Sequence, residues 1–306
     1  MSTRQRPFQQ VDVFTPTPYR GNPLAVVLDG TGLDEAAMQR FARWTNLSET
    51  TFVLPPTEPG ADYALRIFTP GGELPFAGHP TLGSCHAWLA GGGQPQGPEF
   101  IVQQCAVGLV RIRREGRQLA FAAPPLRRSA IAPELLNDLL PALGLMPAQV
   151  RATQRLDNGP VWHGLLLDAP ETVLGLQPDH ARLAALGAKV GVAAAYPPEN
   201  EPPLIARHNR EAKAFATTDR APGPRPDLEV RGFAAPIGVA EDPVTGSLNA
   251  SLAQWLMEDG LMPAQYLASQ GVCLGRAGQV HLQRDAQGQV WVGGETVTCV
   301  HGEVRL

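Results

Sequence analysis

Lysine is almost absent from this sequence. Two of its 25 basic residues are lysines, Lys189 and Lys213, and the rest are arginines. The 29 acidic residues give a formal net charge of −4. The one local group of arginines, in residues 111–117, alternates along an expected strand and predicts a solvated strand face. Because nucleic-acid-binding domains are typically basic, we expect no nucleic-acid partner.

Cysteine is scarce as well. The four cysteines form no C-x-x-C pair and stand at Cys85, Cys105, Cys273 and Cys299. This spacing gives no indication of a zinc ribbon or a dithiol redox site, and no two histidines have the spacing of zinc ligands. We therefore expect no metal, and thiols that are reduced and buried.

Long apolar runs are missing too. No charge-free run reaches the ~18 residues of a membrane span without interruption by glycine, proline or histidine. Residues 1–10 contain no apolar segment of the kind found in signal peptides. We expect a cytoplasmic protein without a membrane partner.

The sequence does contain enough apolar material for a large core. Hydrophobic residues make up 43% of the 306 residues, a length that corresponds to about two domains at ~100–200 residues each. Pro124-Pro125 marks the predicted boundary between an N-terminal domain (1–123) and a C-terminal domain (124–306), with the last strand able to pack on the first domain. Residues 197–226, rich in proline and charge, predict a surface excursion.

Both halves contain a strand, a glycine-containing loop and a mostly apolar helix. Pro80 fits the first turn of a helix that runs to Leu89, and the segment Glu241–Ser247 precedes a helix that ends near Met257. A tryptophan follows the glycine of each loop by about ten residues. The pattern predicts two similar α/β domains, each with a central helix wrapped by a mixed sheet. The alternative is that this order of elements is merely common.

Capping residues and hydrophobic periodicity predict further elements. Asp34 can cap a helix that ends at Trp44. The other expected elements include helices at residues 133–143 and near 178–186, and C-terminal strands at residues 265–272, 279–283, 290–293 and 296–300.

The starts of the two central helices are candidate anion sites. A helix N-terminus has unpaired backbone N–H groups and partial positive charge, and glycine lets a ligand approach the backbone closely. Gly78-His79 and Gly246-Ser247 occupy these positions, and two such ends in one cleft could clamp a small carboxylate. His79 is either a hydrogen-bonded cap or a functional group, and the sequence leaves both open.

Two acidic residues are candidates for acid/base chemistry. Asp242 precedes the second helix, where aspartate is a common capping residue. Glu49 lies between a helix end and a strand entry, and desolvation there would raise its pKa and suit it to proton transfer. The plainer alternative is a loop glutamate that binds the backbone.

Five motifs, in this order, resemble those of a known family. They are Gly21-Asn22-Pro23-Leu24-Ala25-Val26, Asn46-Leu47-Ser48-Glu49-Thr50, Arg66-Ile67-Phe68-Thr69-Pro70, Gly78-His79-Pro80-Thr81-Leu82-Gly83 and Glu241-Asp242-Pro243-Val244-Thr245-Gly246-Ser247. Together with Gln270-Gly271 and Gly275-Arg276, they are similar to the phenazine-biosynthesis isomerase (PhzF-like) family. The resemblance implies an α/β (α+β) fold like that of diaminopimelate epimerase, with two pseudo-symmetric domains and the active site in the cleft between them.

The resemblance also implies a set of catalytic residues. Glu49 corresponds to the glutamate that moves a proton between substrate carbons in the family. His79 and Asp242 correspond to residues that position the substrate and assist proton transfer. The family further implies catalysis without a cofactor or a metal, usually in a homodimer.

Substrate-binding residues follow from the same motifs. Gly78 and Gly246 would offer backbone N–H groups to the substrate carboxylate, which agrees with the argument from the helix starts. Ser247 corresponds to a residue that positions the substrate, and Asn22, in the first motif, joins this set.

We therefore expect a cofactor-independent isomerase that moves a proton between carbons of a small carboxylic acid, such as a dihydro-hydroxyanthranilate-like compound. The alternatives are an epimerase or racemase of a small amino or hydroxy acid, a non-catalytic small-acid binding protein, and a hydrolase that uses Ser247, His79 and Asp242. A racemase with paired thiols is disfavoured, because no cysteine stands at either helix start.

Overall fold

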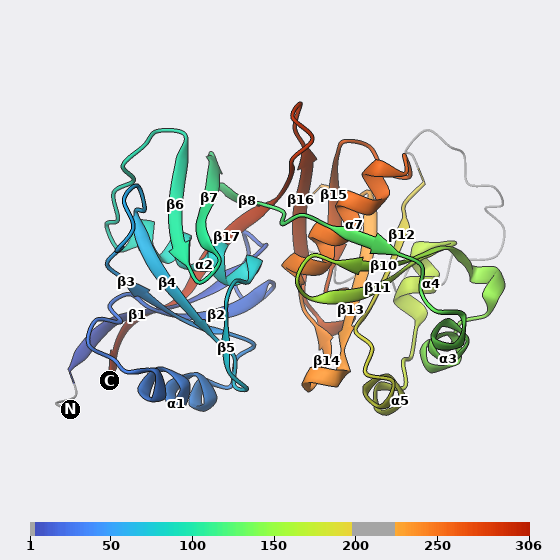
Figure 1. Cartoon of the computed structure of the whole chain (residues 1–306), viewed down its shortest axis with the longest axis horizontal. Coiled ribbons are helices and arrows are strands. Elements are labelled where there is room, and N and C mark those ends of the chain that lie inside the picture. The colour runs from blue at the N-terminus through green and yellow to red at the C-terminus, as the bar shows by residue number, and fades with distance from the viewer. Residues whose placement is uncertain (1–3, 198–223) are drawn as a thin grey trace.

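The protein consists of two halves that lie side by side (Figure 1). The computed structural model describes residues 4–197 and 224–306, so most of the surface excursion predicted at residues 197–226 lies outside the described residues. Helix α2 (Gly78–Ala90) is the central helix of the first half, and α7 (Gly246–Glu258) is that of the second. Each is surrounded by strands of its own half, as the sequence predicts.

A closed ring of eight strands surrounds α2. It runs in the order β1-β2-β3-β4-β6-β7-β8-β17 and returns to β1. The β2–β3 and β4–β6 pairs are parallel and the others antiparallel. The strands of this half are β1 (Gln5–Val13), β2 (Asn22–Val27), β3 (Thr50–Leu54), β4 (Tyr63–Phe68), the short β5 (Glu73–Leu74), β6 (Phe100–Cys105), β7 (Gly108–Glu115), β8 (Gln118–Ala122) and β17 (Val290–Arg305).

Helix α2 can occupy the middle of the ring because its sequence has no charged residue. A helix that is apolar on all sides is typical of a buried position. Gly83 brings its backbone close to the barrel wall, where an added Cβ would come within 2.6 Å of a Leu24 methyl and 2.9 Å of a Val13 methyl. Helix α1 (Glu35–Thr45), by contrast, packs outside the ring against β3 and β4.

The second half is an open, curved sheet that packs against α7. Its strand order is β9-β10-β11-β12-β13-β15-β16-β17, with β14 paired to β13. The strands are β9 (Arg127–Ser129), β10 (Val150–Asp157), β11 (Val161–Leu167), β12 (Val190–Ala195), β13 (Leu228–Ala234), β14 (Val239–Asp242), β15 (Gln265–Gln270) and β16 (Gly278–Arg284).

Short helices pack on the outer face of this second sheet around a core of their own. They are α3 (Pro133–Leu143), α4 (Pro170–Gly175) and α5 (His180–Ala185). The same half also contains the single-turn 3-10 helices η1 (Pro147–Gln149), η2 (Ala235–Ile237) and η3 (Val272–Leu274).

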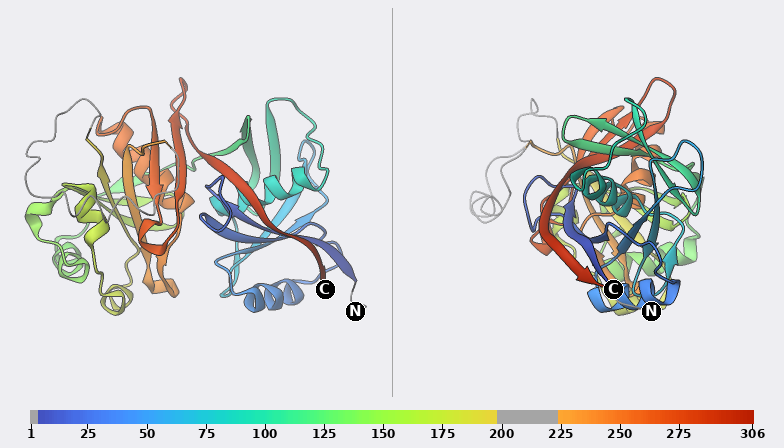
Figure 2. Two further views of the ribbon diagram at one scale, coloured as in Figure 1. Left: turned by 180° about the vertical axis from the view of Figure 1, so that it is seen from behind. Right: turned by 90° about the vertical axis from the view of Figure 1, so that its left-hand side faces the viewer.

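Strand β17 belongs to both halves, and Figure 2 shows it crossing from one to the other. Its first residues pair with β16, its middle with β8 and the rest with β1. The expectation of two short strands at residues 290–293 and 296–300 was therefore wrong. Glycine often interrupts a strand, but here Gly293 and Gly294 permit close packing within a continuous one. An added Cβ would lie 2.7 Å from the Cβ of Ala120 at Gly293 and 2.9 Å from a Phe14 ring carbon at Gly294.

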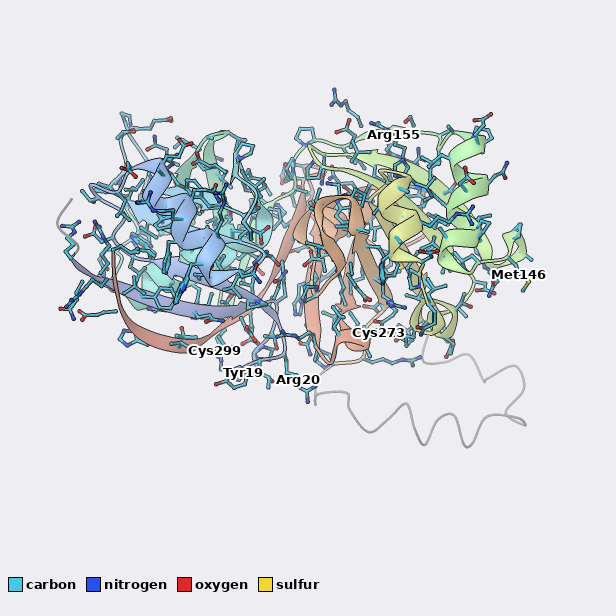
Figure 3. The ribbon with its side chains drawn as sticks, turned by 90° about the horizontal axis from the view of Figure 1, so that it is seen from below. Tyr19, Arg20, Met146, Arg155, Cys273 and Cys299 are labelled. Carbon is cyan, nitrogen blue, oxygen red and sulfur yellow. The ribbon has the colours of Figure 1, made fainter. Side chains whose placement is uncertain are left out.

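The loop between β1 and β2 makes another connection between the halves. Arg20 donates a hydrogen bond to the carbonyl of Gly275 (3.1 Å), and Ala277 N–H donates one to the carbonyl of Arg20 (2.7 Å). Arg276 donates to the carbonyl of Tyr19 (3.2 Å). Figure 3 shows Tyr19 and Arg20 at the surface where the two halves meet.

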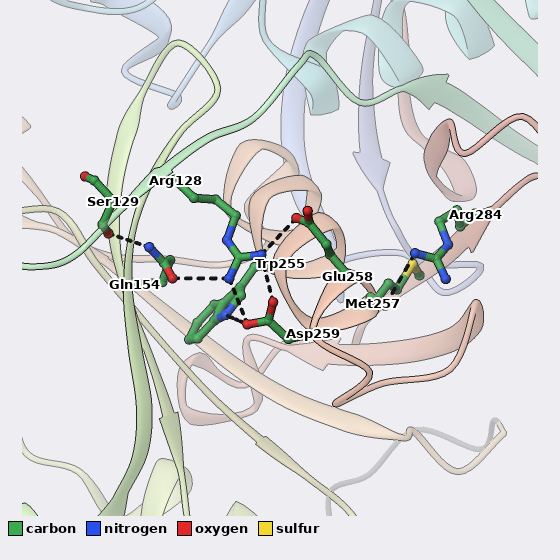
Figure 4. Close-up of polar contacts among 8 residues, drawn as sticks. All are labelled: Arg128, Ser129, Gln154, Trp255, Met257, Glu258, Asp259 and Arg284. Carbon is green, nitrogen blue, oxygen red and sulfur yellow. Dashed lines mark hydrogen bonds and ion pairs between the residues drawn. The ribbon is translucent and has the colours of Figure 1, made fainter.

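Arg128 fixes the segment that enters the second half. Its guanidinium binds Asp259 through two hydrogen bonds (2.8 and 2.7 Å) and Glu258 through a third (2.8 Å), as Figure 4 shows. Asp259 also accepts the indole N–H of Trp255 (2.8 Å). This strand-to-helix contact anchors β9 at the C-terminal end of α7. The domain boundary at residue 123 stays a prediction.

The arginines and cysteines differ in part from the sequence-based expectation. Within residues 111–117, Arg113 is half-buried, with its guanidinium 3.6 Å from the ring centre of Trp291, whereas its arginine neighbours are exposed. All four cysteines are free thiols. Cys85 is buried, but Cys273 is exposed because it lies in η3, so the expectation that all of the thiols are buried was wrong.

Candidate active site

The N-termini of α2 and α7 lie against each other. An ideal Cβ on Gly246 would lie 3.3 Å from the backbone nitrogen of His79 and 3.4 Å from the Cα of Gly78. Neither helix receives a side-chain cap from the described residues. Two sets of unpaired N–H groups, each at the positive end of a helix, therefore meet at one point between the halves, which favours an anion there.

Glycine is required at the start of α2 for steric reasons. A Cβ at Gly78 would come within 2.3 Å of the Phe121 ring. Phe121 is fully buried in the barrel wall, so the ring has no room to retreat. Because Gly78 has no side chain, the helix can start close to the Phe121 ring. No side chain at position 78 covers the N–H groups there.

Glu49 and Asn22 come to the site from neighbouring strands. Glu49 directly precedes β3, and Asn22 is the first residue of β2. These strands are parallel, with Ala25 opposite Thr50, so both residues lie at the same edge of the ring. Asn22 is fully buried, and its side-chain amide donates to the carbonyl of Val244 across the junction (2.9 Å).

The carboxyl group of Glu49 contacts the ring of His79. Oε2 of Glu49 lies 3.5 Å from Nδ1 of His79, with 16% and 6% of the respective side chains exposed. Burial, together with the charge of Asp242, raises the pKa of Glu49 to about 8. Burial lowers the pKa of His79 to about 3, against a weaker opposing effect of the Pro23 backbone. At neutral pH the contact therefore joins a mostly protonated carboxyl and a neutral imidazole, and it is not an ion pair.

Asp242 is held from both sides. One carboxylate oxygen accepts the side-chain amide of Asn22 (3.1 Å), and the other accepts the hydroxyl of Thr245 (2.7 Å). Burial raises the pKa of Asp242, while these two hydrogen bonds act in the opposite direction. The aspartate caps no helix in this arrangement; it links the two halves and places a carboxylate close to Glu49.

Gln270 organises the loop that carries Asp242. This fully buried side chain accepts the backbone N–H of Thr245 (3.0 Å) and donates to the carbonyl of Asp242 and the hydroxyl of Thr245 (3.0 Å each). It also accepts the side-chain amide of Asn249 (2.8 Å). Four hydrogen bonds from one residue fix the segment between β14 and α7.

Ser247 is bound by β11 and by the turn that precedes it. The indole N–H of Trp162 donates to its hydroxyl oxygen (3.1 Å), and the side-chain amide of Asn158 donates to its carbonyl (3.0 Å). The hydroxyl makes no hydrogen bond with His79 among the described contacts, so the hydrolase arrangement of Ser247, His79 and Asp242 is not formed here.

Several buried polar atoms at this junction lack a partner within the described part of the chain. They are Glu49 Oε2, His79 Nε2, Asn22 Oδ1, Asn158 Oδ1 and Asn249 Oδ1. Buried polar atoms are nearly always paired, and each of these residues contacts another residue of the site. Such a concentration of unsatisfied atoms is typical of a site whose partner is a ligand.

The structure thus places all seven residues predicted from the sequence around the meeting point of α2 and α7. They are Asn22, Glu49, Gly78, His79, Asp242, Gly246 and Ser247. Their roles in binding and catalysis stay predictions. The sequence did not indicate Asn158 or Trp162, and Thr245 and Gln270 were noted only as parts of motifs. Within residues 4–197 and 224–306, no group of histidine, cysteine and carboxylate side chains could hold a metal ion.

Comparison with known proteins places the fold and the family. The profile of the "phenazine biosynthesis-like protein" family matches residues 11–302. The chain belongs to this family. A relative from Schizosaccharomyces pombe, named antisense-enhancing sequence 1, is 32% identical over 97% of both chains. The trans-2,3-dihydro-3-hydroxyanthranilate isomerase of Pseudomonas fluorescens is 31% identical and covers 97% of this chain and 98% of its own.

Solved structures of the phenazine biosynthesis-like family and of racemases share the fold. A family member from Bacillus anthracis superposes with a TM-score of 0.79 at 20% identity, over 99% of this chain and all of that one. A probable proline racemase from Agrobacterium radiobacter superposes with a TM-score of 0.59 at 12% identity, over 98% and 93% of the two chains. These results confirm the expected epimerase-like fold, and the family membership identifies the protein as an isomerase. None of the described helices is both long and apolar enough to cross a membrane.

Proposed function

We propose that this isomerase moves a proton between two carbons of a small carboxylic acid, such as a dihydro-hydroxyanthranilate-like compound, with Glu49 as the acid/base. The observation that carries the proposal is the position of Glu49. Its carboxyl group, with a pKa raised to about 8, lies beside the point where the uncapped starts of α2 and α7 meet. This position supports a role for Glu49 as an acid/base group next to a carboxylate bound at the helix starts.

The proposed reaction needs one residue for both proton transfers. The substrate carboxylate binds the N–H groups at Gly78 and Gly246 and the hydroxyl of Ser247. Glu49 in its ionised form takes a proton from one carbon, which leaves an electron pair delocalised along the substrate. The protonated Glu49 then returns the proton to another carbon, so that no proton is gained or lost. A pKa near the working pH keeps both steps accessible.

His79 and Asp242 support Glu49 in different ways. His79, kept neutral by burial, contacts Glu49 through Nδ1 and restricts the carboxyl group to one side of the site. Asp242 contributes negative charge, which keeps the pKa of Glu49 high. Both oxygens of Asp242 are occupied by Asn22 and Thr245. We therefore favour an isomerase with one acid/base group over an epimerase that would use Asp242 as its second base.

The relatives support the substrate class. One relative that matches nearly the whole chain is named trans-2,3-dihydro-3-hydroxyanthranilate isomerase, and that compound is a small cyclic acid. The homodimer, the cytoplasmic location and the absence of a cofactor are further parts of the proposal and rest on the family resemblance. Light scattering on the purified protein would test the dimer.

Deuterium uptake would test the proposed reaction. The protein is incubated in heavy water with a panel of cyclic and acyclic carboxylic and amino acids, and mass spectrometry follows uptake into each compound. We expect uptake to fall by at least about 100-fold in Glu49→Gln and to be unchanged in Glu58→Gln, which alters an exposed glutamate. Full uptake by Glu49→Gln would refute the proposal, and tight binding without any uptake would favour a binding protein.

A further inference from the structure

The side-chain amide of Asn158 has a fixed orientation and an unused acceptor. Asn158 lies in the turn between β10 and β11, and 8% of its surface is exposed. Its nitrogen must be the atom that faces the carbonyl of Ser247, because a carbonyl oxygen can only accept a hydrogen bond. Oδ1 therefore points away from that carbonyl, and it is buried without a partner among the described residues.

The hydroxyl of Ser247 is likewise restricted to one role. The indole N–H of Trp162 can only donate, so the Ser247 oxygen is the acceptor in that contact (3.1 Å). Trp162 is 3% exposed, and its ring cannot turn without disturbing the core. The hydroxyl proton is left to be donated, and no described residue accepts it. Ser247 is thus set as a hydrogen-bond donor.

These two unused groups lie next to the meeting point of the helices. Ser247 follows Gly246, whose ideal Cβ position is 3.3 Å from the backbone nitrogen of His79. Asn158 donates to the carbonyl of the same serine (3.0 Å), so its side chain lies beside the residue that carries the donor hydroxyl. A ligand that places a carboxylate on the hydroxyl and the helix N–H groups would present its neighbouring substituent to Asn158.

We propose that Asn158 and Ser247 select acids that carry an N–H or O–H donor close to the carboxylate. The donor is bonded either to the carbon that bears the carboxylate or to the carbon next to it. The inference rests on the proposed function for the position of the carboxylate. An amino or hydroxyl group there satisfies Asn158 Oδ1, whereas a methyl group leaves a buried acceptor unpaired, which carries a free-energy cost. Trp162 acts as a positioning residue, because it sets the direction of the Ser247 hydroxyl without touching the ligand.

Isosteric acids would test this selectivity. Isothermal titration calorimetry on the full-length protein would compare 2-aminobenzoate with 2-methylbenzoate, which differ in the donor and little in size. We expect the amino compound to bind about tenfold more tightly, in line with one hydrogen bond to a buried acceptor. Equal affinity for the two compounds would overturn the proposal.

Two variants assign the preference to its residue. Asn158→Ala is expected to reduce the preference to twofold or less, and Pro160→Ala, an exposed change in the same turn, is expected to leave it intact. A full preference in a folded Asn158→Ala protein would contradict the role of Asn158.

Trp162→Phe probes the serine separately. Removal of the indole N–H should weaken both benzoates by a similar factor and leave their ratio unchanged, since the carboxylate contact is common to both. A changed ratio would contradict this assignment. The binding measurements do not depend on turnover. If Glu49→Gln retained deuterium uptake, the proposed reaction would fail, but the preference for the amino compound could still be measured. If the preference were absent, the deuterium-uptake test of the proposed reaction would still apply.

Discussion

Glu49 and His79 touch each other, yet burial displaces their pKa values in opposite directions. The carboxyl pKa rises to about 8 and the imidazole pKa falls to about 3. Desolvation is the largest cause in both cases, because it disfavours whichever form is charged. The result is a neutral pair at pH 7, in which a small change of environment can ionise the glutamate.

The raised pKa of Glu49 predicts a pH dependence of stability. The unfolded chain loses this proton near pH 4.5, whereas the folded protein keeps it up to about pH 8. Between these values the folded state holds more protons, so its stability falls as the pH rises through this window. Glu49→Gln cannot ionise. We expect the variant to gain stability relative to the wild type between pH 5 and pH 9, by on the order of a few kcal/mol.

Urea unfolding at pH 5, 7 and 9 would measure this difference. Glu58→Gln, at an exposed position, serves as the control and should follow the wild type at every pH. If the Glu49→Gln and wild-type profiles ran parallel across this range, the carboxyl group would not be held protonated in the folded protein.

Gln270 predicts a second effect at the scale of a residue. Gln270→Leu leaves the N–H of Thr245 and the carbonyl of Asp242 buried without their partners. We expect a loss of about 2–6 kcal/mol in stability, from about 1–3 kcal/mol for each of the two unsatisfied groups. We also expect kcat to fall more than KM rises, because the loop that holds Asp242 moves. Gln265→Leu, an exposed change on the same strand, is the control. A stable variant with normal kcat would show that Gln270 does not position the loop.

The sequence could indicate some of these residues and not others. The residues next to Glu49 in the sequence did not decide between a proton-transfer role and a loop glutamate that binds the backbone. The reason is that the burial of Glu49 depends on the opposite half of the molecule. Asn158 was hidden for a different reason. It precedes Gly159, and an Asn-Gly pair between two strands is a common hairpin turn, so the local pattern already has a sufficient explanation. A contact with Ser247, 89 positions away, leaves no local trace.

At the scale of elements, the two helix starts depend on each other. The first N–H groups of a helix, which have no partner within the helix, usually bind a capping side chain. Here Ala77 and Thr245, at the cap positions, provide none. The N–H groups of both helices are therefore free for a shared anion, and the gap between them is set by the absence of a side chain at Gly246.

Gly246→Ala should separate binding from stability. The added Cβ would lie 3.3–3.4 Å from His79 N and Gly78 Cα, so the helix ends must move apart by a few tenths of an ångström. Alanine also favours the helix by up to about 1 kcal/mol. We expect a stability change within about 1 kcal/mol and a roughly tenfold or greater loss of affinity for benzoate, given that helix-end anion contacts are each worth up to about 2 kcal/mol.

Thermal unfolding and calorimetric titration would measure the two quantities. Gly175→Ala, at a position where an added Cβ meets nothing within 4 Å, is the control for the general effect of the substitution. Unchanged benzoate affinity in Gly246→Ala would show that the anion does not bind between the helix starts.

Helix bounds could be predicted where local signals determine them. Helix α3 begins at Pro133 and ends before Gly144, which has a φ of 72°, and the prediction of 133–143 is confirmed. The cap at Asp34 is confirmed too, by its hydrogen bond from Ala37 N–H (2.7 Å). Elements that depend on a partner strand were missed: the two-residue β5 and the three-residue β9 are defined by their pairing with β4 and β10.

At the scale of the whole molecule, the first half is incomplete without the last strand. β17 fills the space between β8 and β1 and pairs with residues of both. Without it, both neighbours would present unpaired edges, which favour aggregation, and α2 would be uncovered on one side.

A truncation after residue 289 should therefore abolish folding of both halves. We expect the fragment to lack a cooperative thermal transition and to elute as aggregates on size exclusion, since it removes strand pairing from β1, β8 and β16 at once. A truncation after residue 303, which keeps most of the β1 pairing, should retain a cooperative transition. A monomeric fragment 1–289 that unfolds cooperatively would contradict this view.

The shared strand also has a consequence during protein synthesis. On the ribosome, β1 to β8 emerge long before β17, so the first barrel cannot close while the remainder of the chain is being translated. Domains that fold as they are made usually complete the N-terminal unit first. Here β1 and β8 of the nascent N-terminal half keep unpaired edges until the end of translation. Both halves reach their final structure only after the strand that they share has been synthesised.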